Sequence, residues 1–352
     1  MHLRIVGASA DPAFSPAPGS SSLHTRDGRI QGFAGKRRGT IDSRGFHPGH
    51  VRSGSDGRRV RWPFTIVYAI AALCSLWGNG VRAEPLHAQG LLWTIQRAGH
   101  PSSTLFGTMH LDDSRVNELP VPVQRAFDAS DSFTMEAIMD LAAIGAVTQA
   151  MFYPDSSSLR QALGEDTFRR AVTALEGHGL ADPALVERMK PWAIYMMLSQ
   201  PGSGIAVPMD LRLYAMALQQ GKPVYGLESI EAQIAVFDQL PVPEQVMLLR
   251  DTLDLLPRLE DIYEEVTAAY LRRDLAHLLG LQDRLIAPSS RGVYRDFMRR
   301  LLDDRNTRMV EGMEPRLAEG NAFIAVGALH LPGSNGVLHL LEQRGYRVRS
   351  IY

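Results

Sequence analysis

Two histidines occur in the same five-residue pattern, Gly-x-x-His-Leu, and each follows an apolar run typical of a buried β-strand. His110 follows residues 103–109, and His330 follows residues 323–326. Ligands of open α/β sheets bind outside the carboxyl ends of the strands, and neutral imidazole is the commonest protein metal ligand. The repetition therefore predicts one site assembled from distant parts of the sequence, whereas a single Gly-x-x-His would indicate an ordinary turn glycine beside an ordinary histidine.

Two glutamates also end predicted strands. Glu136 ends residues 132–136, and Glu228 ends residues 223–228. Mixed imidazole and carboxylate ligands suit divalent transition ions. A bound ion with an open coordination position lowers the pKa of its water toward neutrality and supplies a hydrolytic nucleophile. Taken alone, each glutamate is typical of a helix cap or a surface carboxylate, but both follow apolar strands.

The elements that must position these residues follow from the apolar patterning. Residues 91–96 and 103–109 flank a turn and predict a strand-turn-strand unit. A helix that ends at Ala129 and the strand 132–136 come next. Because strand-helix-strand units have right-handed crossovers and parallel strands, Glu136 is expected at the same sheet end as His110.

The rest of the chain is mostly helical. Apolar residues recur at three- and four-residue spacing over 141–216, and a long helical region spans 230–313. The chain then closes on the strand 323–326, a loop with His330, a helix over 336–343 and a strand over 346–351. On that last helix His339 is expected to matter only for packing. These patterns predict an α/β or α+β fold, with a mixed sheet built from both chain ends and a helix-rich middle insertion.

Composition excludes several classes of function. The 352 residues carry 37 basic and 38 acidic side chains, a net charge of −1, which gives no overall attraction to nucleic acid. Cys74 is the single cysteine, so no intramolecular disulfide and no cysteine-based zinc site can form. Any metal must be bound by histidines and carboxylates.

The N-terminal part divides into two segments. Residues 1–57 are rich in Gly, Ser, Arg and Pro and predict a disordered extension, or a start codon assigned too early, with translation beginning near Val51 or Val60. Residues 58–83 combine a basic cluster, an apolar stretch and Val-Arg-Ala, the form of a secretory signal. Cleavage after Ala83 would leave residues 84–352 as a periplasmic or secreted domain free of the membrane. A short transmembrane anchor or a buried apolar helix are the alternatives.

Several ordered motifs resemble the TraB/PrgY/GumN superfamily, and in particular its GumN-like branch, which is related to the Tiki metalloproteases. The matching motifs span nearly all of residues 84–352. They are Leu-Phe-Gly-Thr-Met-His at 105–110, Ser-Asp at 130–131 leading to Glu136, Lys-Pro-Trp at 190–192, Asp210 with Gly-Lys-Pro at 221–223, Gly-Leu-Glu at 226–228 with Gln233, Asp-Arg-Asn at 304–306, and Val-Gly-Ala-Leu-His-Leu-Pro-Gly at 326–333.

The resemblance implies a metal site of His110, His330 and Glu136. Glu228 matches another acid position, and Arg305 with Asn306 matches an Arg-Asn pair that would bind substrate or orient the ligands. In many relatives an aspartate closely follows the strand glutamate. Here residues 137–139 separate Glu136 from Asp140, so no acid pair is expected at that position.

These inferences predict an exported metal-dependent hydrolase of the peptidase type that uses Zn²⁺, Mn²⁺ or Co²⁺. Its substrate would be a peptide or a small molecule, and its catalytic residues would be Glu136, Glu228, Arg305 and Asn306. The alternative is a non-catalytic factor of the GumN or PrgY type, acting in envelope polysaccharide biosynthesis or in peptide binding. A bound divalent ion with an open coordination position would favour the enzyme, and fully hydrogen-bonded histidines that lie far apart would favour the factor.

Overall fold

The computed structural model describes residues 85–111, 113–200, 208–286 and 288–352. All of them belong to the compact unit Arg58–Tyr352. The predicted extension over residues 1–57 and the predicted signal over residues 58–83 lie outside the described residues. Within the described ranges, every helix is too short or too polar to span a bilayer.

The described residues form a six-stranded mixed sheet with the order β4-β3-β5-β2-β1-β6. Strands β2, β5, β3 and β4 run parallel to one another, while β1 is antiparallel to both β2 and β6. The strands are β1 (Leu92–Gln96), β2 (Ser103–Thr108), β3 (Ser132–Met135), β4 (Val224–Gly226), β5 (Ala322–Gly327) and β6 (Arg347–Ser350). The predicted α/β fold, with strands from both chain ends, is confirmed.

The helices lie mainly between β3 and β5 in the sequence, as the predicted middle insertion requires. They are α1 (Ser114–Asn117), α2 (Val121–Ala129), α3 (Leu141–Ala150), α4 (Leu159–Leu163), α5 (Glu165–Glu176), α6 (Pro183–Glu187), α7 (Pro191–Leu198), α8 (Met209–Gln219), α9 (Ile230–Asp238), α10 (Val242–Leu255), α11 (Leu259–Leu271), α12 (Leu275–Leu285), α13 (Arg291–Met298), α14 (Asp304–Glu319) and α15 (Val337–Gln343).

Strand β5 is the structural centre of the sheet. All six of its residues are buried, because strands lie on both of its sides and its side chains belong to a core shared with the surrounding helices. It lies between β2 and β3, pairing Thr108 with Gly327 on one side and Thr134 with Ile324 on the other. The carboxyl ends of β2, β3 and β5 therefore meet at one edge of the sheet.

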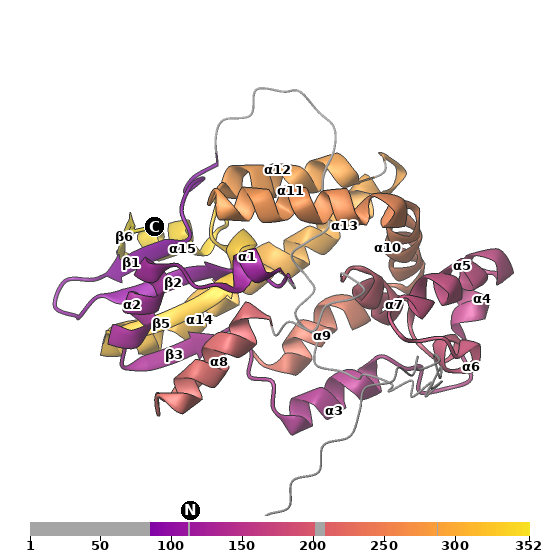
Figure 1. The fold of residues 1–352 in the computed structure, drawn as a ribbon, viewed down its shortest axis with the longest axis horizontal. Helices are drawn as coiled ribbons and strands as arrows, with labels where there is room; N and C mark the ends of the chain where they lie inside the picture. Colours follow the sequence, from indigo (N-terminus) through magenta and orange to yellow (C-terminus); the bar gives the residue numbers. More distant parts are fainter. Residues whose placement is uncertain (1–84, 112, 201–207, 287) are drawn as a thin grey trace, which may run out of the picture. The chain divides into compact units, whose positions relative to one another are not determined.

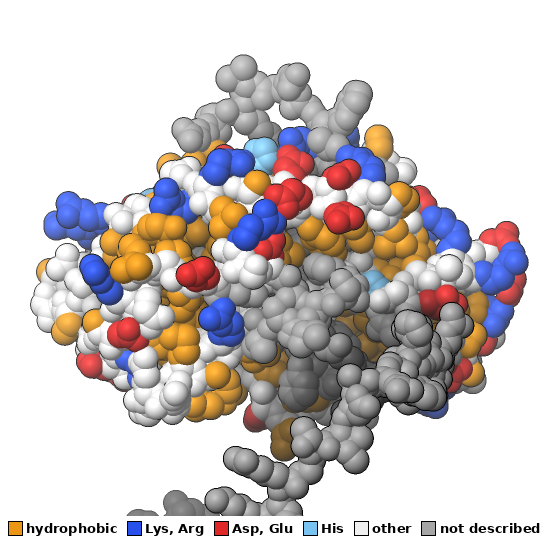
Figure 2. All heavy atoms as spheres, viewed as in Figure 1, with side chains coloured by type: hydrophobic (Ala, Val, Ile, Leu, Met, Phe, Trp, Pro, Cys, Tyr) orange, Lys and Arg blue, Asp and Glu red, His pale blue; other side chains and the backbone are white. Residues whose placement is uncertain are grey.

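Two hydrophobic cores flank this edge. In the first core the sheet packs against α8, α11, α12, α14 and α15. The second core is formed by helices α3, α4, α5, α6 and α7 together with α9, α10 and α13. Met139, Leu256 and Met298 pack against both cores. In Figure 1 the strands lie together at the left and the helices α4 to α7 lie at the right. The face seen in Figure 2 intersperses basic and acidic side chains, in keeping with the small net charge.

Candidate functional site

Four predicted site residues lie just beyond the carboxyl ends of four parallel strands. His110 follows β2, Glu136 follows β3, Glu228 follows β4, and His330 ends the 3₁₀ turn η5 (Ala328–His330) after β5. Parallel strands end at a common sheet edge, which is where α/β proteins bind ligands. The topology thus brings together residues that are more than 200 positions apart in the sequence.

The position of Gly327 shows how closely three of them approach. A β-carbon placed on Gly327 would lie 3.3 Å from Oε1 of Glu136, 3.5 Å from Cδ2 of His330 and 3.7 Å from Nε2 of His110. The Nε2 atom of His330 is 3.7 Å from Oε1 of Glu136. The two imidazoles and the carboxylate therefore surround one small space beside Gly327.

The ring of His110 is fixed by Asp210, from the first turn of α8. Nδ1 of His110 lies 2.7 Å from Oδ2 of Asp210, and the Thr108 hydroxyl donates to the other carboxylate oxygen at 2.9 Å. A carboxylate only accepts, so Nδ1 carries a hydrogen and Nε2 faces the space beside Gly327. Burial alone lowers the pKa of His110, but the Asp210 carboxylate together with Glu136 outweighs burial and raises that pKa above its usual value.

The ring of His330 is fixed by Asn306. Nδ1 of His330 is 2.6 Å from Oδ1 of Asn306, whose amide nitrogen donates to the Asn335 carbonyl at 2.8 Å. This second bond orients the amide, so Nδ1 of His330 is the donor and Nε2 keeps its lone pair. Burial, with the neighbouring Arg305 and His110 cations, lowers the pKa of His330 to about 3 and keeps the ring neutral.

Glu136 is held as a carboxylate. Its Oε1 accepts the Gly327 amide at 2.7 Å, and its Oε2 accepts Nη2 of Arg305 at 2.6 Å. Burial opposes its ionisation, but Arg305, the two histidines and the Gly327 amide together lower its pKa to about 2. Glu136 is therefore charged at neutral pH.

Arg305 links the two glutamates. Its side chain is almost fully buried, and Nη2 contacts both Glu136 and Oε1 of Glu228, while Nε donates to the same Glu228 oxygen at 2.9 Å. Gln233 on α9 also reaches both acids, with Nε2 at 3.0 Å from Glu228 and 3.3 Å from Glu136. A π-helical turn, η4 (Arg299–Asp303), directly precedes α14 and Arg305. Such turns often occur at functional sites.

The donor types suit a divalent cation, but Nε2 of His110, Nε2 of His330 and Oε1 of Glu136 do not all lie within 4.8 Å of one another, so these groups would have to move closer to share an ion. The carboxylates of Asp210 and Glu228 are buried and that of Glu136 is mostly buried, and among the described residues their cationic partners are the Arg305 guanidinium and, when protonated, His110. Oε2 of Glu228 is buried with no hydrogen-bond partner in the described part of the chain. Nε2 of His110, Nε2 of His330 and Oε1 of Glu136 could hold the ion. Nη1 of Arg305 lies 3.4 Å from Nε2 of His330, next to that position.

Sequence reasoning gave no site role to three of these residues, Thr108, Asp210 and Gln233. Asp210 lies in the first turn of a helix, where acidic residues are common because they interact favourably with the helix dipole. Its position in the sequence therefore did not indicate a contact with His110. Gln233 belongs to a matched motif, but the sequence does not show that it touches both glutamates. Asn306, predicted as a catalytic residue, contacts the far nitrogen of His330.

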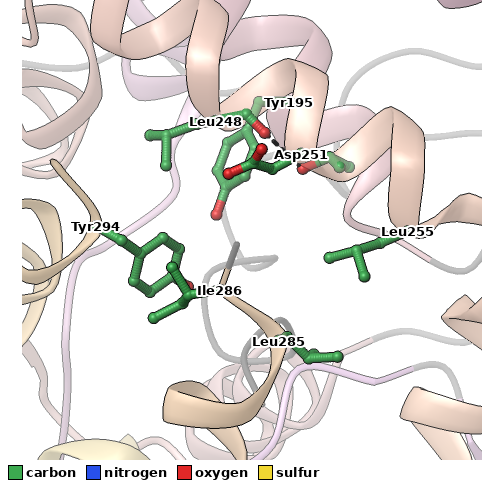
Figure 3. Close-up of a pocket in the computed structure, with 8 residues that line it drawn as sticks. Tyr195, Leu248, Asp251, Leu255, Leu285, Ile286 and Tyr294 are labelled. Carbon is green, nitrogen blue, oxygen red and sulfur yellow. Dashed lines mark hydrogen bonds between the residues drawn. The ribbon is translucent and has the colours of Figure 1, made fainter. Parts of the chain in front are cut away.

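A separate pocket lies within the helical part (Figure 3). Its lining is Tyr195, Leu248, Asp251, Thr252, Leu255, Leu285, Ile286 and Tyr294. Burial raises the pKa of Asp251. This lining includes none of the predicted site residues.

Comparison with known protein families identifies the class of protein to which this fold and its paired histidine motifs belong. The chain matches the model of the TraB/PrgY/gumN family over residues 91–350, and it belongs to this family. No solved structure matches the chain significantly.

Its relatives include proteins named as metalloproteases. "Metalloprotease TIKI2" of Xenopus tropicalis is 27% identical and aligns with 73% of this chain and 59% of its own length. "Metalloprotease TIKI1" of Homo sapiens is 26% identical, over 76% of this chain and 63% of its own. "Uncharacterized protein YbaP" of Escherichia coli is 24% identical, over 70% of this chain and 90% of its own. The chain thus spans less than two thirds of these two TIKI relatives.

Proposed function

We propose that this protein is a metal-dependent hydrolase of the peptidase class. The observation that carries the proposal is the convergence of two imidazole nitrogens and the Glu136 carboxylate on the space beside Gly327. Relatives named as metalloproteases support the same chemistry.

In this proposal His110, His330 and Glu136 hold a divalent ion, with Zn²⁺, Mn²⁺ or Co²⁺ as the candidates. The ion, when bound, would polarise the scissile carbonyl and lower the pKa of water. Asn306 accepts the Nδ1 hydrogen of His330, and the Asp210 carboxylate lies 2.7 Å from Nδ1 of His110, so each residue orients the Nε2 of one ligand ring toward the ion. Partners of this kind orient metal ligands and raise their basicity.

Glu228 is the proposed general base. Its Oε1 is occupied by Arg305 and Gln233, whereas its Oε2 makes no hydrogen bond to any described residue and is available to accept a proton from the attacking water. Arg305 holds the two glutamates in place, so its proposed role is positioning. The substrate is proposed to be a peptide met outside the cytoplasm, because residues 58–83 have the form of a secretory signal.

The test is metal content together with hydrolysis of a peptide library by the purified protein, supplied in turn with Zn²⁺, Mn²⁺ and Co²⁺. His110→Ala and His330→Ala should each abolish hydrolysis and release the ion at this site. His100→Ala is the matched control, because His100 is exposed and its ring contacts the Ala318 carbonyl instead. Full hydrolysis in either site variant, or none in the wild type with every ion, would reject the proposal.

A non-catalytic binding factor is the second candidate. It is favoured by Arg305, whose guanidinium already pairs with both glutamates and lies beside His330. A folded wild-type protein that retains no ion at His110 and His330 and cuts no peptide would support this alternative.

A further inference from the structure

We propose a second divalent metal site, formed by His87, His339 and Glu342, with Zn²⁺ as the ion. This site would tie the segment before β1 to the last helix, α15. It uses none of the residues assigned to hydrolysis. His339, expected from the sequence to serve packing alone, instead lies within hydrogen-bonding distance of a carboxylate.

The distances suit a tetrahedral ion. Nε2 of His87 and Nδ1 of His339 lie 3.1 Å and 3.4 Å from the same oxygen, Oε2 of Glu342. The three ligand atoms all lie within 4.8 Å of one another. Around a tetrahedral Zn²⁺ with bonds of about 2.0 Å, ligand atoms are about 3.3 Å apart. Small side-chain adjustments would therefore complete the coordination.

The ring of His87 is positioned before any ion binds. His87 has a left-handed backbone with φ of 56°, a conformation uncommon outside glycine. The ring meets Trp93 edge to face, with centroids 5.2 Å apart. The Gly333 amide donates to the neighbouring Leu86 carbonyl at 2.8 Å. These contacts hold the segment against the loop that follows His330.

The other two ligands come from one face of α15. His339 and Glu342 are three positions apart, so their side chains are neighbours on the helix surface. All three side chains are partly exposed, at 15% for His87, 27% for His339 and 38% for Glu342. An ion can reach them from solvent, and water can provide a fourth ligand.

A comparable histidine-glutamate pair shows what distinguishes the proposed site. Nε2 of His277 lies 2.9 Å from Oε1 of Glu265, but the third group at that oxygen is the Arg284 guanidinium. A guanidinium cannot donate a lone pair to a metal. Among the described residues, the His87 cluster is the group in which three ligand-type side chains approach this closely.

Binding of Zn²⁺ would stabilise the folded protein by mass action, because the unfolded chain does not hold the three ligands together. The ion would join parts of the chain separated by more than 250 positions. Since Leu86 is bonded to Gly333, the added stability would extend to the loop beside His330.

The experiment is a Zn²⁺ titration of the purified, untagged protein, with bound zinc measured after gel filtration. His339→Ala and Glu342→Gln should each bind one equivalent fewer than the wild type. They should also lose the zinc-induced rise in melting temperature that this site provides. The same variants in a His330→Ala background should again lose one equivalent, which separates this site from the proposed hydrolytic one. His277→Ala is the matched control and should leave the stoichiometry unchanged.

Glu342→Gln keeps an acceptor for both imidazoles, so it tests metal binding without breaking the cluster, and circular dichroism reports whether each variant folds. Unchanged stoichiometry and unchanged zinc stabilisation in folded Glu342→Gln would overturn the proposal. If the hydrolytic site binds no ion, the wild type should still bind one equivalent, and both variants should bind none.

Discussion

Gly107 and Gly327 occupy the same position of the repeated Gly-x-x-His pattern, but different contacts require them. A β-carbon on Gly107 would lie 2.7 Å from the Leu331 side chain and 3.1 Å from the Ala328 backbone, within the packing of β2 against η5. A β-carbon on Gly327 would enter the space shared by His110, Glu136 and His330. One glycine therefore serves packing and the other keeps the site open.

The first prediction compares alanine at these two positions. Gly327→Ala should remain folded, because its φ of −54° suits any residue, yet it should lose metal binding at this site and hydrolysis. Gly107→Ala should lower the free energy of unfolding by about 1–3 kcal/mol through overpacking. Urea unfolding and metal content measure the two effects. Normal metal binding by Gly327→Ala would contradict the assigned space.

The second prediction concerns Asp210, which orients His110. Asp210→Asn should weaken metal binding about 10–100-fold, the usual cost of losing such a partner. In the metal-free protein the pKa of His110 should fall, because burial is then opposed by Glu136 without the larger contribution of Asp210. Equilibrium dialysis and NMR titration of the ring measure these changes. An unaltered His110 pKa would show that Asp210 does not control this ring.

For individual residues, the sequence predicted the side chains at the strand ends but not the side chains that contact them. His110, Glu136, Glu228 and His330 could be predicted because each follows an apolar run. Asp210 and Gln233 come from helices whose approach to the site depends on tertiary packing. No local pattern encodes that approach.

Among the elements, the π-helical turn η4 and helix α14 present Arg305 to two buried glutamates. The third prediction is that Arg305→Met lowers the free energy of unfolding by about 3–5 kcal/mol, since it leaves buried carboxylates unpaired. Adding Glu228→Gln should recover part of that loss. Arg299→Met removes an ion pair from a half-exposed arginine on the same segment, and it should cost at most about 1 kcal/mol. Urea unfolding compares the variants. If the losses in the free energy of unfolding caused by Arg305→Met and Glu228→Gln were additive, this result would contradict the pairing of Arg305 with Glu228.

The helices that line the pocket of Figure 3 carry the fourth prediction. Burial raises the pKa of Asp251 above 3.8, so between the unfolded and the folded pKa the folded state holds this proton more tightly than the unfolded state. Stability is therefore lost as pH rises through the folded pKa. Asp251→Asn should raise the melting temperature by roughly 1–3 °C at pH 7 and by less at pH 4. An equal shift at both pH values would contradict the assigned pKa direction.

Element types were predictable where the patterning was strong. The strand-turn-strand unit and the parallel arrangement of β2 and β3 are confirmed, because apolar runs and short crossovers leave few alternatives. The placement of β5 between β2 and β3 and the pairing of β1 with β6 were not predicted. The β2–β5 and β1–β6 pairings join residues more than 200 positions apart, and periodicity within a segment does not specify its distant partner.

For the molecule as a whole, the fifth prediction concerns the natural N-terminus. The secretory form of residues 58–83 predicts cleavage after Ala83, so that Glu84 begins the mature protein. Mass spectrometry of protein isolated from its native host measures that terminus. Recovery of the uncleaved chain in the membrane fraction would favour the anchor instead.

The central position of β5 also fixes when the site can exist during synthesis. Strands β2 and β3 are not neighbours in the sheet, and the strand that lies between them is β5 (Ala322–Gly327), which follows both of them and the helical insertion in the sequence. Pairings of such high contact order form late. A nascent chain that carries His110 and Glu136 therefore has no assembled site until β5 and His330 have been synthesised and have folded against β2 and β3, and the proposed ion cannot be held before that step.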